Sequence, residues 1–254
     1  MKDVHITKPD HELELEKVGI EGFKRIINIK RPPYNYHILV TISSYITLPS
    51  NQKGAHMSRF VESINNIPNE ISSIKSLAEN ISINMLKIHG FNCETEIIGE
   101  LPFKKIKPNG EEEIAIAKIF TKFSTKNNKS FIGISLNGVL ACPCSKELTN
   151  GLTHNQRGEL TVEIDVTNYN IEPFGIIDIC NKSFSSPTFS LLKRPEEKQV
   201  VEEIHQNPKF VEDANRKCVA LLKEKYSGRR CRVKCISFES IHDHNVSAEW
   251  KGVL

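Results

Sequence analysis

The residues with the clearest chemical potential lie between positions 141 and 158, in the segment ACPCSKELTNGLTHNQRG. Cys142 and Cys144 stand one residue apart, and His154 follows in a polar, glycine-flanked stretch. Thiolates and imidazoles bind metal ions, and a thiolate is also a nucleophile. The segment follows a strongly apolar stretch, and the end of a strand can hold a side chain firmly while leaving it accessible. A disulfide clip, half of a zinc site and an active site are therefore all open interpretations.

The cysteine content of the chain argues against the disulfide. The sequence has seven cysteines, an odd number, and its charged N-terminal segment lacks the apolar core of a secretory signal. Clustered thiols in such a chain are expected to be reduced and to bind metal or act in catalysis. A bond between Cys142 and Cys144 would also close a small, strained ring. Incidental cysteines in a surface loop are the remaining alternative, which is disfavoured because free cysteines are usually buried.

A second group of candidate ligands lies in FESIHDHN, residues 238–245. If this segment is a regular strand, His242 and His244 share one face, because side chains in a strand alternate. Together with Glu239 they would form a metal-binding or acid–base patch. A solvated strand end is an equally good interpretation of the segment taken alone. The other five cysteines are predicted to be small core residues: Cys93, Cys180, Cys218, Cys231 and Cys235.

A third candidate segment, NQKGAHMSRF, begins at residue 51 and places His56 and Arg59 at the start of a predicted helix. A glycine turn that leads into a helix with basic side chains nearby can bind phosphate. An ordinary capped helix has the same sequence features, so this segment alone is weak evidence.

Composition limits the classes of function. With 254 residues, a net charge of +3 and 39% hydrophobic residues, the chain is typical of a globular protein with one large domain or two modules. The small net charge does not indicate a nucleic-acid partner. No stretch approaches the roughly 18 apolar residues that a membrane span requires, so we expect a cytoplasmic protein with no membrane partner.

The elements that must position these residues follow a pattern that occurs twice. In the first half, alternating residues predict a strand at 13–30, with a bulge at a central glycine, and another at 36–48. Apolar residues spaced three and four apart then predict helices over 57–89, divided by Pro68, and a further strand follows.

In the second half, strands are predicted at 112–124, 129–141 and 158–166, a short helix at 171–180 and a long one at 208–226. Asn207 is the predicted N-cap of the long helix, and Gly228 lies just past its end. Strands over 229–244 and 246–253 complete the chain. The pattern predicts an α+β fold of two similar modules, residues 1–108 and 109–254.

Six separated segments together resemble the type IB GTP cyclohydrolases. The N-terminal segments VHITKPDHELELEKVGI and LPSNQKGAHMSR are most similar to the archaeal MptA branch. The segments are, in order, QKGAHMSRF, CPCSK, THNQRG, LLKRPEEK, NPKFVEDANR and FESIHDH, spread over residues 52–244. The resemblance implies the tunnelling fold (T-fold), in which antiparallel strands and paired helices assemble into a β-barrel across subunits. A homodimer or homotetramer is therefore expected.

The resemblance also implies a metal-dependent enzyme that opens the imidazole ring of GTP at C8 and releases formate. The archaeal branch forms 7,8-dihydroneopterin 2′,3′-cyclic phosphate with Fe(II), whereas the bacterial branch forms dihydroneopterin triphosphate. A set of thiolate, imidazole and carboxylate ligands suits Fe(II), and equally Zn(II) or Mn(II), better than Mg(II).

Site residues follow from the same resemblance. Cys142 resembles a metal ligand, Cys144 the thiol close to C8, and His154 a ligand or proton-transfer group. Other residues resemble metal ligands or substrate contacts. The implied metal set is Cys142, His154, Glu197, Glu239 and His242, with Glu196 the alternative to Glu197; the implied substrate contacts are Glu212, at the guanine edge, and His56, Arg59, His244 and Arg157.

Two other classes of function remain open at this point. The first is a non-catalytic zinc-binding module in which Cys142, Cys144, His154 and a C-terminal histidine close a structural site. The second is an enzyme of the same fold that uses a nucleophilic cysteine on another purine or pterin without the metal set.

Overall fold

The computed structural model describes residues 3–31 and 34–254, which form two compact units. The first unit consists of Met1–Glu100 and Phe120–Ile132, and the second of Leu101–Ile119 and Gly133–Leu254. Strands β4 (Cys93–Ile106), β5 (Glu112–Ser124) and β6 (Lys129–Ala141) each contribute residues to both units. The units therefore interleave along the chain, whereas the predicted modules are continuous. The module boundary at residue 108 stays a prediction.

The first unit is built on a long antiparallel pair, β1 (Leu15–Arg31) and β2 (Tyr34–Leu48), with β4 beside β2. The register of the β1–β2 pair shifts between Ile20 and Phe23, where Gly22 adopts a φ of 73°. A left-handed residue at a register shift is the geometry of a β-bulge. The predicted bulged strand is thus confirmed.

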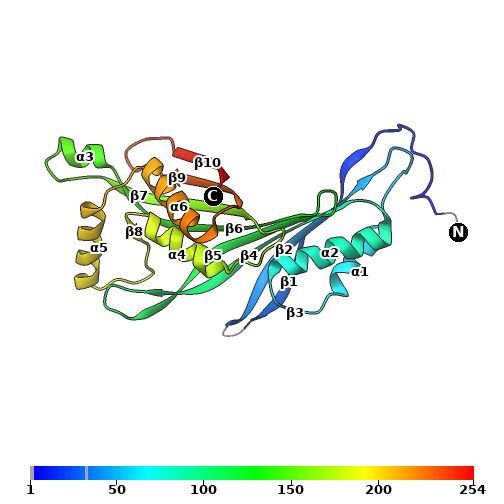
Figure 1. Ribbon diagram of the computed structural model, residues 1–254, viewed down its shortest axis with the longest axis horizontal. Helices are drawn as coiled ribbons and strands as arrows, with labels where there is room; N and C mark the ends of the chain where they lie inside the picture. The colour runs from blue at the N-terminus through cyan, green and yellow to red at the C-terminus, as the bar shows by residue number, and fades with distance from the viewer. Residues whose placement is uncertain (1–2, 32–33) are drawn as a thin grey trace. The chain divides into compact units, whose positions relative to one another are not determined.

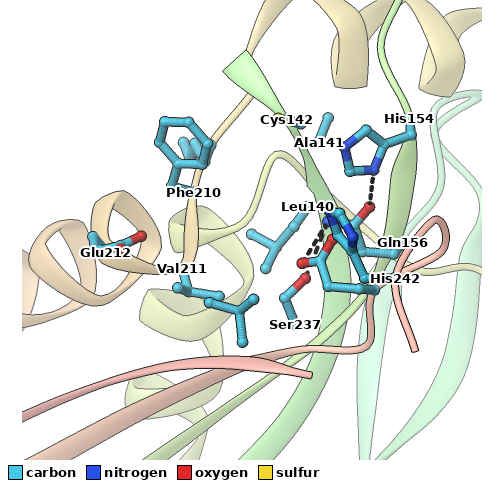
Figure 2. A pocket seen from close by; sticks show the side chains of 13 residues that line it. Leu140, Ala141, Cys142, His154, Gln156, Phe210, Val211, Glu212, Ser237 and His242 are labelled. Carbon is cyan, nitrogen blue, oxygen red and sulfur yellow. Dashed lines mark hydrogen bonds between the residues drawn. The ribbon is translucent and has the colours of Figure 1, made fainter. Parts of the chain in front are cut away.

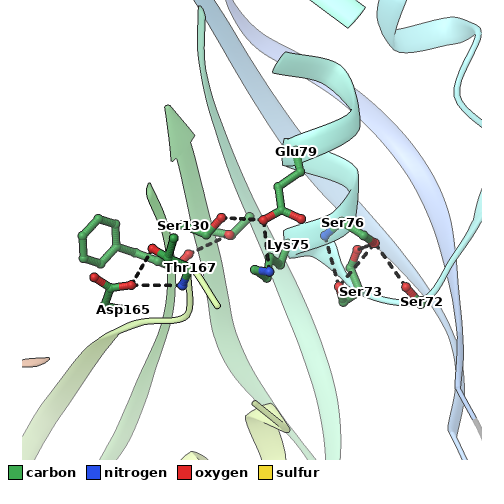
Figure 3. A network of polar contacts seen from close by, with 10 residues as sticks. Ser72, Ser73, Lys75, Ser76, Glu79, Ser130, Asp165 and Thr167 are labelled. Atoms are coloured by element: carbon green, nitrogen blue, oxygen red, sulfur yellow. Dashed lines mark hydrogen bonds and ion pairs between the residues drawn. The ribbon is translucent and has the colours of Figure 1, made fainter. Parts of the chain in front are cut away.

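Two helices pack together beside β1 and β2, as Figure 1 shows: α1 (Met57–Asn65) and α2 (Ile74–His89). The short strand β3 (Glu70–Ile71) lies between them and pairs with β1. The Ser73 side chain caps α2 by accepting from the backbone of Ser76, and Glu79 binds both Lys75 and Ser130 (Figure 3). The prediction of two helices divided near Pro68 is confirmed.

The second unit repeats the plan of an antiparallel sheet with paired helices. Its strands β7 (Asn155–Asp165), β9 (Arg230–Ser237) and β10 (Val246–Val253) pair in the order β7–β9–β10, and the short β8 (Ser186–Pro187) pairs with β6. Helices α4 (Pro173–Ser183) and α6 (Val211–Tyr226) pack against each other, and α6 also packs on β9 and β10 (Figure 1). The result is the predicted α+β architecture.

The structure departs from the sequence predictions in four places. The segment around Cys142 and Cys144 contains a short helix, α3 (Pro143–Leu148), and residues 194–206 form a helix, α5 (Arg194–Gln206), neither of which was predicted. Asn207 ends α5 and does not cap α6, which begins three residues later than predicted. Residues 238–245 form a loop after β9, so the strand-alternation argument for His242 and His244 does not apply.

All seven cysteines are free, and the five predicted core cysteines are buried. Among residues 3–31 and 34–254, no helix is both long and apolar enough to cross a membrane.

Candidate active site

A cavity of about 240 Å³ opens in the second unit where β6 ends and β7 begins (Figure 2). Its wall combines one thiol, two imidazoles, two carboxylates and an ammonium group with several apolar side chains. The lining residues are Leu140, Ala141, Cys142, His154, Gln156, Lys209, Phe210, Val211, Glu212, Ser237, Glu239, His242 and Val246.

Cys142 is fixed by its position as the N-cap of α3. Its Sγ accepts a hydrogen bond from the Ser145 backbone at 3.4 Å, and Pro143 occupies the first turn of the helix, where no backbone donor is needed. The Cys142 backbone N–H donates to the His154 carbonyl at 3.2 Å. The thiol and the histidine are therefore held together by the backbone, although they lie on different segments.

Gln156 is the centre of the polar network in the cavity (Figure 2). Its Oε1 lies 3.0 Å from His154 Nδ1, and its Nε2 donates to Ser237 Oγ at 3.0 Å and to Glu239 Oε1 at 3.3 Å. His154 directly precedes β7 and Gln156 is the second residue of that strand, and their side chains meet in the cavity.

This network determines which nitrogen of His154 carries a proton. A carboxylate only accepts hydrogen bonds, so the Gln156 amide nitrogen must face Glu239 and the amide oxygen must face His154. Nδ1 of His154 is then the donor, and Nε2 keeps its lone pair. A histidine prepared in this way can bind a metal ion or accept a proton.

Lys209 brings a buried ammonium group to the cavity wall. Its Nζ donates to the Phe184 carbonyl, and its backbone N–H donates to Ala141 at 2.9 Å. Burial, reinforced by the nearby Lys217, lowers the pKa of Lys209 to about 8. The Phe184 ring is held against Gly138 of β6, where an added Cβ would lie 2.1 Å from the ring.

The opposite wall is the start of α6. Glu212, in the first turn, and the half-exposed Phe210 both line the cavity. An acidic side chain is stabilised at a helix N-terminus, and it remains available to accept hydrogen bonds from a ligand.

Comparison with known proteins identifies the family. The family model for the type I GTP cyclohydrolase FolE2 matches residues 1–248. MptA of Pyrococcus abyssi is 35% identical over 262 residues, covering 95% of this chain and 96% of that protein. FolE2 of Thermosipho africanus is 33% identical over 256 residues, covering 98% of this chain and 96% of that protein. The chain belongs to the type I GTP cyclohydrolase family.

The match extends to fold. Uricase of Arthrobacter globiformis superposes with a TM-score of 0.54 at 8% sequence identity, covering 94% of this chain and 93% of uricase. The predicted T-fold is confirmed, and the chain is a GTP cyclohydrolase, a hydrolase, by family.

MptA of Methanococcus aeolicus is 33% identical over 298 residues, covering 99% of this chain and 96% of that protein. FolE2 and MptA relatives are thus equally near.

The structure brings together part of the predicted site of this GTP cyclohydrolase. Five of the predicted residues line the cavity: Cys142, His154, Glu212, Glu239 and His242. Four others from the second unit do not line it: Cys144, Arg157, Glu197 and His244. The remaining two, His56 and Arg59, belong to the first unit.

The structure distinguishes the two candidate glutamates, Glu196 and Glu197. Glu196 is buried, accepts from the Lys193 backbone at 2.6 Å as the cap of α5, and lies 3.7 Å from the Lys107 ammonium. Glu197 is exposed. The Glu196 carboxylate is thus engaged by the Lys193 backbone and by Lys107, which leaves Glu197 as the exposed carboxylate of the pair.

The donors around the cavity suit a borderline divalent metal. Cys142 offers a thiolate, His154 and His242 offer imidazoles, and Glu239 offers a carboxylate, which is a mixed set that Fe(II), Zn(II) or Mn(II) accepts. Within the described part of the chain, these donors do not form a group at mutual metal-ligand distance. The donor types fit the ion.

Sequence reasoning missed Gln156, Ser237 and Lys209. The two-residue spacing from His154 is a sequence signal that points to Gln156. Ser237 and Lys209 gave no local signal, because pairing between distant segments brings them to the cavity.

Proposed function

We propose that this protein is a metal-dependent GTP cyclohydrolase of the MptA type. It opens the guanine imidazole ring of GTP at C8, releases formate and forms 7,8-dihydroneopterin 2′,3′-cyclic phosphate. The observation that carries the proposal is the cavity in which Cys142, His154, Glu239 and His242 face Glu212. The cyclic phosphate retains one phosphorus of GTP, so the other two leave as diphosphate.

Cys142, His154, Glu239 and His242 would hold the ion, with Glu197 a further candidate. A bound divalent ion lowers the pKa of water and so provides a hydroxide nucleophile at neutral pH. Gln156 keeps the proton of His154 on Nδ1, so that Nε2 serves as ligand or proton acceptor. Cys144 is proposed as the thiol that meets C8, and Fe(II) as the metal, with Zn(II) or Mn(II) as alternatives.

Glu212 is proposed to recognise the base. A carboxylate accepts from both the N1–H and the 2-amino group of guanine, whereas adenine presents no such pair of donors. Lys209 places positive charge on the cavity wall, where it stabilises negative charge that develops as the ring opens. His56, Arg59, Arg157 and His244 are proposed to contact the remainder of the nucleotide.

Glu212→Gln tests the base contact. We expect the KM for GTP to rise by roughly 100-fold, because one amide cannot accept both hydrogen bonds. We also expect the preference of GTP over inosine triphosphate, which lacks the 2-amino group, to shrink. Glu224→Gln, an exposed position at the other end of α6, is the matched control. An unchanged GTP/inosine preference in Glu212→Gln would contradict this role.

The FolE2-type product, dihydroneopterin triphosphate, is a second candidate, since FolE2 relatives at 33% and 34% identity are as near as MptA relatives. One reaction decides between them. Anaerobically purified protein is incubated with GTP and Fe(II) or Mn(II), and formate, diphosphate and product mass are measured. Equal amounts of formate and diphosphate support the MptA type; formate without diphosphate supports the FolE2 type. No formate with any metal would refute the cyclohydrolase proposal.

We also propose that the protein assembles into a homodimer or homotetramer. Large apolar side chains are exposed on strands of each unit, including Ile26 and Leu39 in the first and Ile114 and Ile116 in the second. Exposed apolar residues of this kind are typical of interaction surfaces. Light scattering coupled to gel filtration gives the mass; a monomer at micromolar concentration would contradict the proposal.

A further inference from the structure

A cluster of two histidines and an aspartate lies in the first unit, outside the cavity around Cys142; one of its members, His56, is also proposed above as a nucleotide contact. His5 Nδ1 lies 3.2 Å from Asp3 Oδ1, and His56 Nε2 lies 3.1 Å from Asp3 Oδ2. The centroids of the two imidazole rings are 4.3 Å apart. In the described part of the chain, this is the group whose ligand atoms all lie within 4.8 Å of one another.

The backbone holds the two segments of this cluster together. The N–H of Gly54 donates to the His5 carbonyl at 3.1 Å, and the N–H of Lys53 donates to the Thr7 carbonyl at 2.8 Å. The His5 ring lies against Gly54, where an added Cβ would be 3.3 Å from the ring. His56 is the N-cap of α1 and is only partly exposed. The cluster is therefore built by the fold and does not depend on chance contacts between mobile side chains.

We propose that Asp3, His5 and His56 form a second metal site, which binds a borderline divalent ion such as Zn(II), Co(II) or Ni(II). Ligands at about 2.1 Å from a metal are roughly 3.0 Å apart in octahedral and 3.4 Å apart in tetrahedral geometry. The two separations, 3.2 Å to Oδ1 and 3.1 Å to Oδ2 of Asp3, lie in this range. One ligand atom from each of the three residues lies within 4.8 Å of the others. In the metal-free protein a hydrogen bond joins His5 to Asp3 and an ion-pair contact joins His56 to Asp3, and a metal ion would take the place of these contacts.

The donor set determines the kind of ion. Two imidazoles and one carboxylate match Zn(II), Co(II) and Ni(II) better than Mg(II), which prefers oxygen ligands. Three protein ligands leave positions open for water or for an oxygen of an anionic ligand. The site contains no sulfur, and in this respect it differs from the cavity around Cys142.

The surrounding charges moderate the affinity. Arg59 lies one helical turn from His56 and opposes a cation. His89, across from Phe60, has its pKa lowered to about 4 by burial and by the charges of Arg59 and His56, so it adds no charge at neutral pH. The single carboxylate of Asp3 therefore supplies the negative charge that directly faces the ion.

Cobalt titration of the full-length, tag-free, metal-free protein tests the site. Thiolate-bound Co(II) gives a charge-transfer band in the near ultraviolet, whereas Co(II) bound only by nitrogen and oxygen gives weak visible bands alone. In Cys142→Ser, which removes the thiolate, we expect one equivalent of Co(II) to bind with visible bands and no charge-transfer band. His154, Glu239 and His242 remain in this variant and could also bind Co(II), so the equivalent assigned to the Asp3 site is the one that His5→Gln and Asp3→Asn weaken, and failure of the proposed function would not affect this comparison.

His5→Gln and Asp3→Asn in the same Cys142→Ser background are expected to weaken this equivalent at least tenfold. His11→Gln is the matched control, because His11 is exposed and lies on the same N-terminal segment. Circular dichroism monitors α1 and α2 in each variant. Absence of Co(II) binding in Cys142→Ser, or equal binding by His5→Gln and His11→Gln, would overturn the proposal.

Discussion

The two histidine clusters of this protein differ in the group that holds the imidazole. In the second unit, His154 hydrogen-bonds the neutral amide of Gln156, which in turn donates to Glu239. In the first unit, His5 hydrogen-bonds the carboxylate of Asp3, and His56 lies 3.1 Å from the other oxygen of the same carboxylate. In the second unit the Gln156 amide therefore separates the histidine from the nearest carboxylate. In the first unit no residue stands between the histidines and the carboxylate.

This difference separates two ways of preparing a histidine. An amide oxygen fixes the proton on one ring nitrogen and leaves the other nitrogen facing a ligand. A carboxylate accepts directly from the imidazole, so a cation that binds both groups must displace the shared proton. The first arrangement suits a site that turns over substrate, and the second suits a site that retains an ion.

The largest effect is expected from the thiol that only the cavity possesses. Cys142→Ala should lower kcat/KM at least about 1000-fold, because it removes a proposed metal ligand. Cys142→Ser retains an N-cap acceptor for α3 and should be equally inactive. Formate release and bound metal are measured together with thermal melting. If Cys142→Ala melts normally and retains activity, the cavity is not the reaction centre.

Gln156→Glu converts the cavity histidine to the arrangement found in the first unit. We expect kcat/KM at pH 7 to fall by about 10- to 100-fold, because the new carboxylate favours charged His154 and repels Glu239. The optimum should move to higher pH, where the imidazole loses its proton. Gln156→Met, which removes the network without adding charge, should reduce activity without moving the optimum. Identical pH profiles for the two variants would remove the distinction between amide and carboxylate.

Lys209→Met tests the charge on the cavity wall. Activity should fall about tenfold at pH 7, because a charge-stabilising donor is lost. Since the pKa of Lys209 is about 8, the wild-type enzyme should lose activity as pH rises through 8, and the variant should lack this decline. Stability has the opposite trend. The unfolded chain holds this proton up to about pH 10.5, so wild-type stability should rise between pH 8 and 10.5, and this rise should be missing in the variant.

His89 gives the smallest effect and concerns the first unit. Its pKa is lowered from 6.5 to about 4, chiefly by burial, so the unfolded state binds more protons within this interval. Stability should therefore fall as pH drops from 6.5 to 4, by roughly 1–2 kcal/mol after allowance for partial exposure. His89→Phe, which can pack on Phe60, should flatten this slope in urea titrations across the interval. An unchanged slope would show that His89 does not contribute to acid sensitivity.

The strands and the faces of their side chains were well predicted, because the alternation of apolar and polar residues can be read directly from the sequence. The bulged β1 and the buried Cys231 and Cys235 of β9 follow from it. Helix α5 was missed because its buried apolar residues are only Val200 and Ile204, too narrow a stripe to stand out.

The start of α6 was misplaced for a different reason. Asn207 and Pro208 have the residue types of a helix start, but the hydrogen bond from Asn207 to Glu203 makes Asn207 the end of α5. Of the sites, the cavity donors were predicted from their motifs. The pairing of Asp3 and His5 with His56 was not predicted, since it depends on backbone contacts between segments far apart in the sequence.

The surroundings of Gly138 limit which substitutions the protein can tolerate at this position. Gly138 touches no cavity group directly, yet any side chain there would collide with the Phe184 ring, whose carbonyl accepts from Lys209. If relief of that collision also shifts the Phe184 backbone, its carbonyl no longer accepts from Lys209 and a buried ammonium loses a hydrogen-bond acceptor. In a mutational screen, Gly138 would therefore score with the active-site residues although it lines no part of the cavity, and a purely distance-based map of tolerated positions would misclassify it.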